Sequence, residues 1–443
     1  MRQCFVLSVL KNKKIKMELI KYPNKGSWKT LLKRPTIDTN LLEHTVQSVL
    51  TDVQQNGQSA VRRYTMQFDK VSVENALVTP EEFLEATTHI SSELKQAIQL
   101  AKNNIELFHT AQKEEVKIIE TAPGVKCWRK SIAIEKVGLY IPGGSAPLFS
   151  TILMLGIPAK LAGCEEIVLC TPPNNEGKIN NAILYTAQLI GITKVFKIGG
   201  VQAIGAMAYG TEIVPQVYKI FGPGNQYVTC AKLLVNKNGT AIDMPAGPSE
   251  VAVIADDSCN PEFVAADLLS QAEHGADSQV ILISDNETVI EAIQNEIDKQ
   301  LNELPRKETA QLALNNSKAF LVKDKTEAIE LVNEYAPEHL IIACADNELM
   351  AEQVINAGSV FLGNYSCESA GDYASGTNHT LPTNGYAKAY SGVSLDSFVK
   401  KVTFQKLTKK GIQTIGPAIE LMAEAEGLQA HKNAVTVRLN SKI

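Results

Sequence analysis

The residues best suited to metal binding and proton transfer lie in four separate segments of the chain. Gln271 and His274 end a predicted helix that begins at residues 260–262 with Asn-Pro-Glu, a helix-start pattern. Their spacing of three residues places an amide oxygen and an imidazole nitrogen on one helix face. The other three segments hold Glu338 with His339, Asp372 with His379, and Glu426 with His431. Four of the seven histidines of the chain lie in these segments.

Each segment alone has an ordinary structural explanation. A histidine near a helix end, such as His274 or His431, more often caps the helix or interacts with its dipole than binds a metal. Glu338 with His339 could simply open an apolar strand, and Asp372 could form an Asx turn. Together, however, one Gln, one Asp and two His make an N/O ligand set suited to zinc, with manganese or cobalt also accommodated. The remaining histidines lie on polar helical stretches where we expect no site: His44, His89 and His109.

The composition restricts the classes of protein to which the chain can belong. Its 443 residues suggest roughly two or three domains, and 44% hydrophobic with 21% charged residues is ordinary for a globular enzyme with a large core. We do not expect a membrane protein. The net charge of −5 and the lack of a basic stripe with interleaved aromatics argue against nucleic acid as a partner. We therefore expect a small-molecule substrate.

The cysteines and the first residues of the chain bear on its location. Eight cysteines are scattered without a C-x-x-C pair, which predicts neither a disulfide framework nor a thiolate zinc site. A reducing cytoplasm fits best, and we assign no cysteine a catalytic role. Residues 1–16 combine a short apolar run with basic residues but have no small-residue cleavage site, so we expect an extension ahead of Met17 and not a signal peptide.

Strand and helix patterns along the chain predict an α/β fold. Residues 40–112 have apolar residues at helical spacing, and residues 116–134 have the pattern of a β-hairpin. Strands followed by glycine turns come next, and a second set of strands is again spaced by helical stretches. The expected strands are 137–141, 167–170, 195–198 and 218–221, then 250–254, 279–283, 319–322, 340–343 and 359–362.

These elements predict two Rossmann-like parallel-sheet domains, with a helical N-terminal region and a C-terminal helical tail. The ligand crevice of such a sheet lies at the carboxyl ends of its strands, where the glycine turns occur. None of these turns has the G-x-G-x-x-G spacing, so the glycines alone do not identify a nucleotide site. The expected division is an extension at 1–16, a first α/β domain made of 17–135 and 249–390, a second domain at 136–248, and a tail at 391–443.

Six ordered motifs together resemble the histidinol dehydrogenase family. They are GPGN at 222–225, GPSE at 247–250, SQAEHG at 270–275, PEHL at 337–340, GDYASGTNH at 371–379 and EGLQAH at 426–431. The resemblance runs from about residue 17 to the C-terminus, and the number and order of the motifs make it specific. The chain departs from the family pattern in its N-terminal extension and in Cys367, and neither lies at a family functional position.

The resemblance implies a reaction and a role for each candidate residue. The reaction is the four-electron oxidation of L-histidinol to L-histidine through an aldehyde, with two NAD+ reduced per turnover. Glu338 and His339 would be the acid/base pair, with His339 taking the alcohol proton and Glu338 activating the water that hydrates the aldehyde. The residues that would bind one zinc ion, which orients the substrate, are Gln271, His274, Asp372 and His431.

The resemblance also implies the remaining contacts. Ser249, His379 and Glu426 would bind the substrate together with His339 and the metal ligands. The dinucleotide would bind through Tyr140, Gln202 and Asn225, each in or just after a glycine turn. A homodimer is implied whose tail, residues 391–443, crosses to the partner, so that Glu426 and His431 act in the other subunit's site.

Two other classes of protein remain open from the sequence. One is a zinc-dependent hydrolase that uses Glu338 as its base, although the domain with the glycine turns would then have no use. The other is a binding protein in which zinc is purely structural, since a closed set of four ligands suits a structural site. Production of NADH on addition of histidinol separates both from a dehydrogenase.

Overall fold

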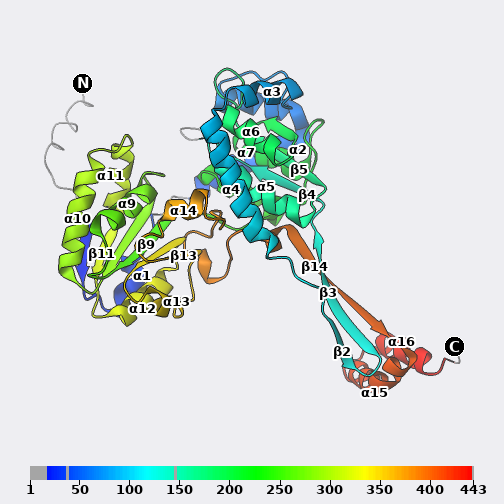
Figure 1. The fold of residues 1–443 in the computed structure, drawn as a ribbon. Helices are drawn as coiled ribbons and strands as arrows, with labels where there is room; N and C mark the ends of the chain where they lie inside the picture. Colours follow the sequence, from blue (N-terminus) through cyan, green and yellow to red (C-terminus); the bar gives the residue numbers. More distant parts are fainter. Residues whose placement is uncertain (1–16, 36–38, 144–146, 442–443) are drawn as a thin grey trace.

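A computed structural model of the protein describes residues 17–35, 39–143 and 147–441 (Figure 1). It contains two α/β domains, each built on a parallel sheet, and an arm that extends away from them and carries the C-terminal helices. In the described part of the chain, no helix combines the length and the apolar character needed to cross a membrane. The two parallel sheets confirm the α/β architecture expected from the sequence.

The first domain is built on a six-stranded sheet in the order β1-β11-β10-β9-β12-β13, with every neighbouring pair parallel. Its central strands β9, β10 and β12 are buried along their whole length because helices cover both faces of the sheet. The strands are β1 (Glu18–Lys21), β9 (Glu250–Ala255), β10 (Gln279–Ser284), β11 (Lys318–Leu321), β12 (His339–Ala343) and β13 (Ser359–Leu362).

Two groups of helices enclose this sheet. One core joins α9 (Pro261–Ala272), α10 (Glu287–Leu301) and α11 (Lys307–Asn315) to one face of the sheet. The other core joins α1 (Trp28–Leu31), α12 (Lys325–Tyr335) and α13 (Asn347–Ala351) to the opposite face. A short helix, α14 (Glu368–Tyr373), follows β13 and packs against α9.

The second domain is built on a five-stranded parallel sheet in the order β6-β5-β4-β7-β8. Its strands are β4 (Lys136–Tyr140), β5 (Glu166–Thr171), β6 (Lys194–Lys197), β7 (Lys219–Phe221) and β8 (Ala241–Ile242). The helices between these strands are α5 (Phe149–Ala162), α6 (Asn181–Leu189), α7 (Gly200–Tyr209) and α8 (Gln226–Lys237).

The N-terminal helices belong to the second domain. Helices α3 (Pro80–Thr88) and α4 (Ser92–Thr110) share a core with α5 and α6, whereas α2 (Thr39–Tyr64) packs against α7 and α8. The expected division placed residues 17–135 with the first sheet, but this packing places only β1 and α1 of that segment there. An amphipathic pattern shows that a helix has a buried face, but it does not show which sheet that face covers.

The arm is an antiparallel three-stranded sheet with two helices at its far end (Figure 1). The expected hairpin at 116–134 is present as β2 (Ile118–Ala122) and β3 (Val125–Ala133). Its other neighbour is β14 (Val399–Leu407), a strand within the tail that was predicted to be helical. Helices α15 (Lys409–Ala425) and α16 (Gln429–Leu439) follow and pack against each other.

Short single-turn elements complete the fold. They are η1 (Lys25–Ser27), η2 (Thr65–Asp69), η3 (Tyr386–Lys388) and η4 (Leu395–Phe398). The first of these precedes α1, and η2 extends the end of α2.

Candidate active site

The candidate catalytic residues lie where strands β9 and β12 begin. His339 is the first residue of β12, and Glu250 is the first residue of the neighbouring strand β9. Helix α9 runs back along the sheet after β9, so its C-terminal end brings Gln271 and His274 to the same edge. Asp372 comes from α14. This cluster therefore lies at the amino edge of its sheet and not at the carboxyl edge that the crevice rule favours.

The Glu338-His339 pair is buried and held by the backbone of Glu250. The Glu250 N–H donates to Oε2 of Glu338 at 2.9 Å, and Nδ1 of His339 lies 3.3 Å from the Glu250 carbonyl oxygen. Nδ1 of His339 also lies 3.7 Å from Oε2 of Glu338. The opposite ring nitrogen, Nε2, faces Oδ1 of Asp372 at 3.5 Å. The imidazole thus bridges a general-base candidate and a metal-ligand candidate.

A cluster of possible metal ligands lies beside this pair. One ligand atom from each of His274, Glu368 and Asp372 can be chosen so that all three lie within 4.8 Å of one another. Glu368 was not among the residues expected from the sequence, because the motif that carries Asp372 begins only at residue 371. The available signal was its spacing of four residues from Asp372, which places both carboxylates on one face of α14.

Burial and mutual charge set the protonation of these groups. Burial raises the pKa of Glu338 to about 7 and that of Glu368 to about 8. Burial opposes the charged form of His339, but the surrounding carboxylates, first Glu368 and then Glu338 and Asp372, outweigh it and raise the pKa of His339 to about 10. For Asp372, burial is likewise outweighed by the contact with His339, which lowers its pKa. The cluster therefore holds buried carboxyl groups that resist ionisation, and a bound cation would stabilise their charged forms.

Buried polar atoms in the cluster fit a metal ion. Among the described residues, Nε2 of His339 and Oδ1 of Asp372 are buried without a hydrogen-bond partner, because 3.5 Å is too long for a good bond. Gln271 can donate to the Glu368 carboxylate and accept from the Glu250 N–H at 3.0 Å. These nitrogen and oxygen donors are suitable for zinc.

His379 connects this site to the second domain. Its Nδ1 lies 2.9 Å from the backbone oxygen of Asp372, and its Nε2 lies 3.0 Å from Oγ1 of Thr151 on α5. Burial lowers the pKa of His379, so the ring is neutral near pH 7. The adjacent Asn378 side chain donates to the backbone oxygen of Met154 at 2.6 Å. The loop after α14 is thus anchored on α5.

The dinucleotide candidates gather at the carboxyl edge of the five-stranded sheet. Tyr140 ends β4, and its hydroxyl accepts from the Gly200 N–H at 3.1 Å. Gln202 is fully buried, and within the described chain its Oε1 has no hydrogen-bond partner. The side chain of Asn225 caps α8. Asp69 was missed in the sequence; its Oδ2 lies 3.4 Å from Nε2 of Gln202, and burial raises its pKa to about 6.

The family model for histidinol dehydrogenase matches residues 32–439. A histidinol dehydrogenase of Bacteroides thetaiotaomicron is 63% identical over 425 residues, covering 96% of this chain and 99% of that protein. The enzyme of Pectobacterium atrosepticum is 52% identical over 92% of both chains. The crystal structure of histidinol dehydrogenase from Elizabethkingia anophelis superposes with a TM-score of 0.95 at 57% identity, covering 97% of this chain and 99% of that one.

The chain belongs to the histidinol dehydrogenase family. It is therefore an oxidoreductase of histidine biosynthesis, and the resemblance seen in the sequence is confirmed. Membership also argues against the zinc-dependent hydrolase that the sequence left open, because full-length relatives share one activity name.

Not every residue expected in the histidinol dehydrogenase site lies near it within one chain. Glu426 follows α15 and His431 lies on α16, and both are exposed at the far end of the arm, away from α14 (Figure 1). Ser249 immediately precedes β9, and its carbonyl oxygen accepts from the Gln279 N–H at 3.2 Å. A single chain thus brings together Gln271, His274 and Asp372 but not the two tail residues.

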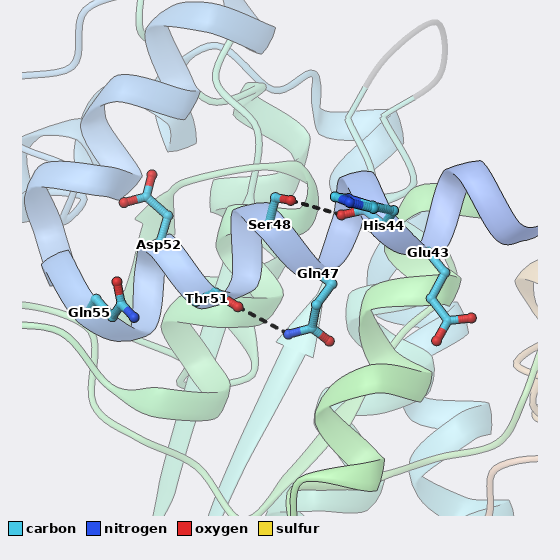
Figure 2. Close-up of a pocket in the computed structure, with 7 residues that line it drawn as sticks. All are labelled: Glu43, His44, Gln47, Ser48, Thr51, Asp52 and Gln55. Carbon is cyan, nitrogen blue, oxygen red and sulfur yellow. Dashed lines mark hydrogen bonds between the residues drawn. The ribbon is translucent and has the colours of Figure 1, made fainter.

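A hollow on the surface of the second domain is separate from this site (Figure 2). All the residues that line it come from α2, and they include His44, Gln47 and Asp52. The hydrogen bonds drawn there join residues one turn apart on that helix, such as Gln47 to Thr51 at 3.1 Å. His44 therefore has the surroundings of a surface helix residue, as the sequence indicated.

Proposed function

We propose that this histidinol dehydrogenase family member binds one zinc ion per site and reduces two NAD+ while it converts L-histidinol to L-histidine. The observation that carries the proposal is the contact between the Glu338-His339 pair and the cluster of candidate metal ligands. His339 lies between Glu338 on one side and Asp372 of the ligand cluster on the other. A substrate held at the cluster would therefore have an imidazole and a carboxylate directly beside its reacting carbon.

Gln271, His274 and Asp372 would hold the metal from this chain. A bound zinc ion would supply a Lewis-acid template for the amino and imidazole nitrogens of histidinol. His274 suits this role because desolvation of its ring lowers the pKa, which favours the neutral form that binds a metal. The residue as a whole is exposed to solvent. Glu368, within the same cluster, is a further oxygen donor at that position.

The two steps divide between adjacent side chains. In the first, His339 takes the hydroxyl proton of the alcohol as hydride leaves the carbon for NAD+, which produces the aldehyde and NADH. A bound cation would offset the carboxylates that raise the pKa of His339 to about 10, and the ring could then be neutral and accept this proton. In the second, Glu338 takes a proton from a water molecule as the oxygen of that water adds to the aldehyde carbon. The hydrate then loses hydride to a second NAD+ and yields the carboxylate. Burial favours this division because it raises the pKa of Glu338 to about 7, near the value of an efficient base at neutral pH.

NAD+ would bind at the carboxyl edge of the five-stranded sheet through Tyr140, Gln202 and Asn225. Within the described residues, Oε1 of buried Gln202 has no hydrogen-bond partner, which supports this position because a buried amide oxygen without a partner is costly. The contact of His379 with Thr151 on α5 links the substrate site to this sheet. Ser249 and His379 would complete the substrate contacts made by this chain.

We further propose a homodimer in which the arm of one chain reaches the site of the other. The exposure of Glu426 and His431 on the arm supports this arrangement, because neither can reach the cluster of its own chain in this conformation. The partner subunit's His431 would then complete the metal site. We place the protein in the cytoplasm, which agrees with the free state of the cysteines in the described residues.

The product ratio tests the function as a whole. Purified protein given excess NAD+ and a limiting amount of histidinol should form two NADH for each histidine released. Heat-inactivated protein is the control for uncatalysed reduction. A ratio of one, with free aldehyde accumulating, would contradict the two-step reaction.

A further inference from the structure

One arginine outside the candidate site contacts both segments that hold the Glu338-His339 pair. Arg34 follows α1, and its guanidinium binds Glu250 with two nitrogens: Nε faces Oε1, and Nη2 lies 2.8 Å from Oε2. Nη2 also donates to the backbone oxygen of Tyr335 at 2.7 Å. The guanidinium lies over the Tyr335 ring, 4.1 Å from its centroid. The side chains of Arg34 and Glu250 are only 14% and 2% exposed, so this ion pair is buried.

The first segment held by Arg34 is the start of β9. The backbone of Glu250 contacts both candidate acid/base groups, through its N–H to Glu338 and its carbonyl oxygen toward Nδ1 of His339. The Glu250 side chain is fixed by Arg34 and by the N–H of Asn384, which donates to Oε1 at 2.7 Å. Because the side chain of Glu250 is fixed, its backbone N–H and carbonyl oxygen stay in place to contact Glu338 and His339.

The second segment is the turn directly before the pair. Tyr335 ends α12, and Ala336 then adopts a left-handed conformation with φ of 53°. Residues other than glycine, asparagine and aspartate rarely adopt this conformation, so the surrounding contacts must hold it. The contacts of Arg34 with the Tyr335 oxygen, and at 3.4 Å with that of Ala336, lie at this turn. Glu338 follows two residues later.

We propose that Arg34 is a positioning residue for the oxidation, which acts by fixing Glu338 and His339 between β9 and the turn at 335–336. The inference rests on the proposed roles of that pair. Arg34 itself touches no reacting atom. A planar guanidinium suits the task because it can bind a carboxylate with two nitrogens and a carbonyl at the same time, whereas a lysine ammonium is a single point charge.

The test compares Arg34→Lys and Arg34→Ala with the wild-type protein. Small displacements of catalytic groups cost on the order of a hundredfold in rate, so kcat of the aldehyde half-reaction should fall by about that factor. The KM for histidinol and the zinc content should stay within about threefold, because the metal ligands do not contact Arg34. The matched control is Arg63→Ala, which breaks an exposed arginine–carboxylate pair with Asp52 and should leave kcat unchanged.

Chemical rescue separates positioning from a general loss of folding. The hollow lined by Arg34, Tyr335, Asn384 and Gly385 opens this site to small solutes. Guanidinium at millimolar concentration should therefore restore kcat of Arg34→Ala at least about tenfold, whereas ammonium should not. An Arg34→Lys variant with wild-type kcat would overturn the proposal. So would a loss of rate in both variants that merely equals the loss of folded protein measured by thermal unfolding.

A double-mutant cycle with Glu338→Gln tests the route of the effect. If Arg34 acts through Glu338, the Arg34→Ala change should cost much less in the Glu338→Gln background, as expected for residues that act as a unit. Full additivity of the two effects on ln kcat would overturn the proposal. If Glu338→Gln alone left the aldehyde step unchanged, the proposed role of Glu338 would fail instead. The two failures are therefore distinguishable.

Discussion

The proposed exchange of arms between subunits gives a quantitative prediction for mixtures of two inactive variants. His274→Asn removes a proposed ligand on the domain that carries the cluster, and His431→Asn removes the proposed ligand on α16 at the end of the arm. Each variant alone should form dimers without an intact site, lose zinc and show no activity. In a mixed dimer, one site combines both substitutions and the other combines the unchanged His274 of one chain with the unchanged His431 of the other.

The expected recovery follows from random pairing. Equal amounts of the two variants give about half mixed dimers, each with one intact site of two, so about a quarter of all sites should be complete. The mixture should thus regain about a quarter of wild-type activity and of zinc content. If His431 instead acted in its own chain, no pairing could create an intact site, and recovery should be zero.

The assay needs independent proof that the subunits exchange. The two variants can carry different affinity tags, and mixed dimers can be isolated by sequential purification before NADH formation is measured. A mixture of wild-type protein with the double variant is the matched control for exchange conditions. Isolated mixed dimers that contain no zinc and make no NADH would refute the shared site, whatever the activity of the unsorted mixture.

Further predictions concern the base, the dinucleotide edge and the core. Because burial raises the pKa of Glu338 to about 7, the aldehyde step should accelerate as pH rises through neutrality, when the carboxyl loses its proton, and level off above it. Glu338→Gln should slow that step by roughly a hundred- to ten-thousandfold and remove this pH dependence, while single-turnover oxidation of the alcohol stays largely intact. Gly222 has φ of 125°, and an added Cβ would clash with the backbone oxygen of Tyr140; Gly222→Ala should therefore weaken NADH binding in a fluorescence titration. Lys232 forms a buried ion pair with Asp243, so Lys232→Met should lower the free energy of unfolding in urea by about 3–5 kcal/mol. A loss below 1 kcal/mol would show that the pair is not needed for stability.

The local patterns of the chain identified most of the elements and the ligand types. Apolar runs such as those of β9, β10 and β12 are buried on both faces, and the alternation of such runs with helical stretches indicated parallel sheets. Gln271, His274 and Asp372 could be grouped because their side chains carry the chemistry and the motifs resemble one family. What these patterns could not give was the pairing of distant segments.

Three features show the limit of local reasoning. The alternating residues of β14 could have indicated a strand, but its partner β3 lies far away in the sequence. Glu368 becomes a candidate ligand only once residues 368–373 are known to form a helix. Arg34 has no motif around it, and its contact with Glu250 joins two segments that nothing in the sequence connects.

The pairing of β3 with β14 has a consequence for the order in which the chain can fold. Both α/β domains can assemble from segments that precede β14, but the central strand of the arm acquires its second neighbour only when the last part of the chain has been synthesised. Until then, β2 and β3 form a two-stranded ribbon in which the edge of β3 that later pairs with β14 is free. Such ribbons are marginally stable and readily pair with other chains. Premature termination before β14 should thus yield an aggregation-prone product even though the domains are complete.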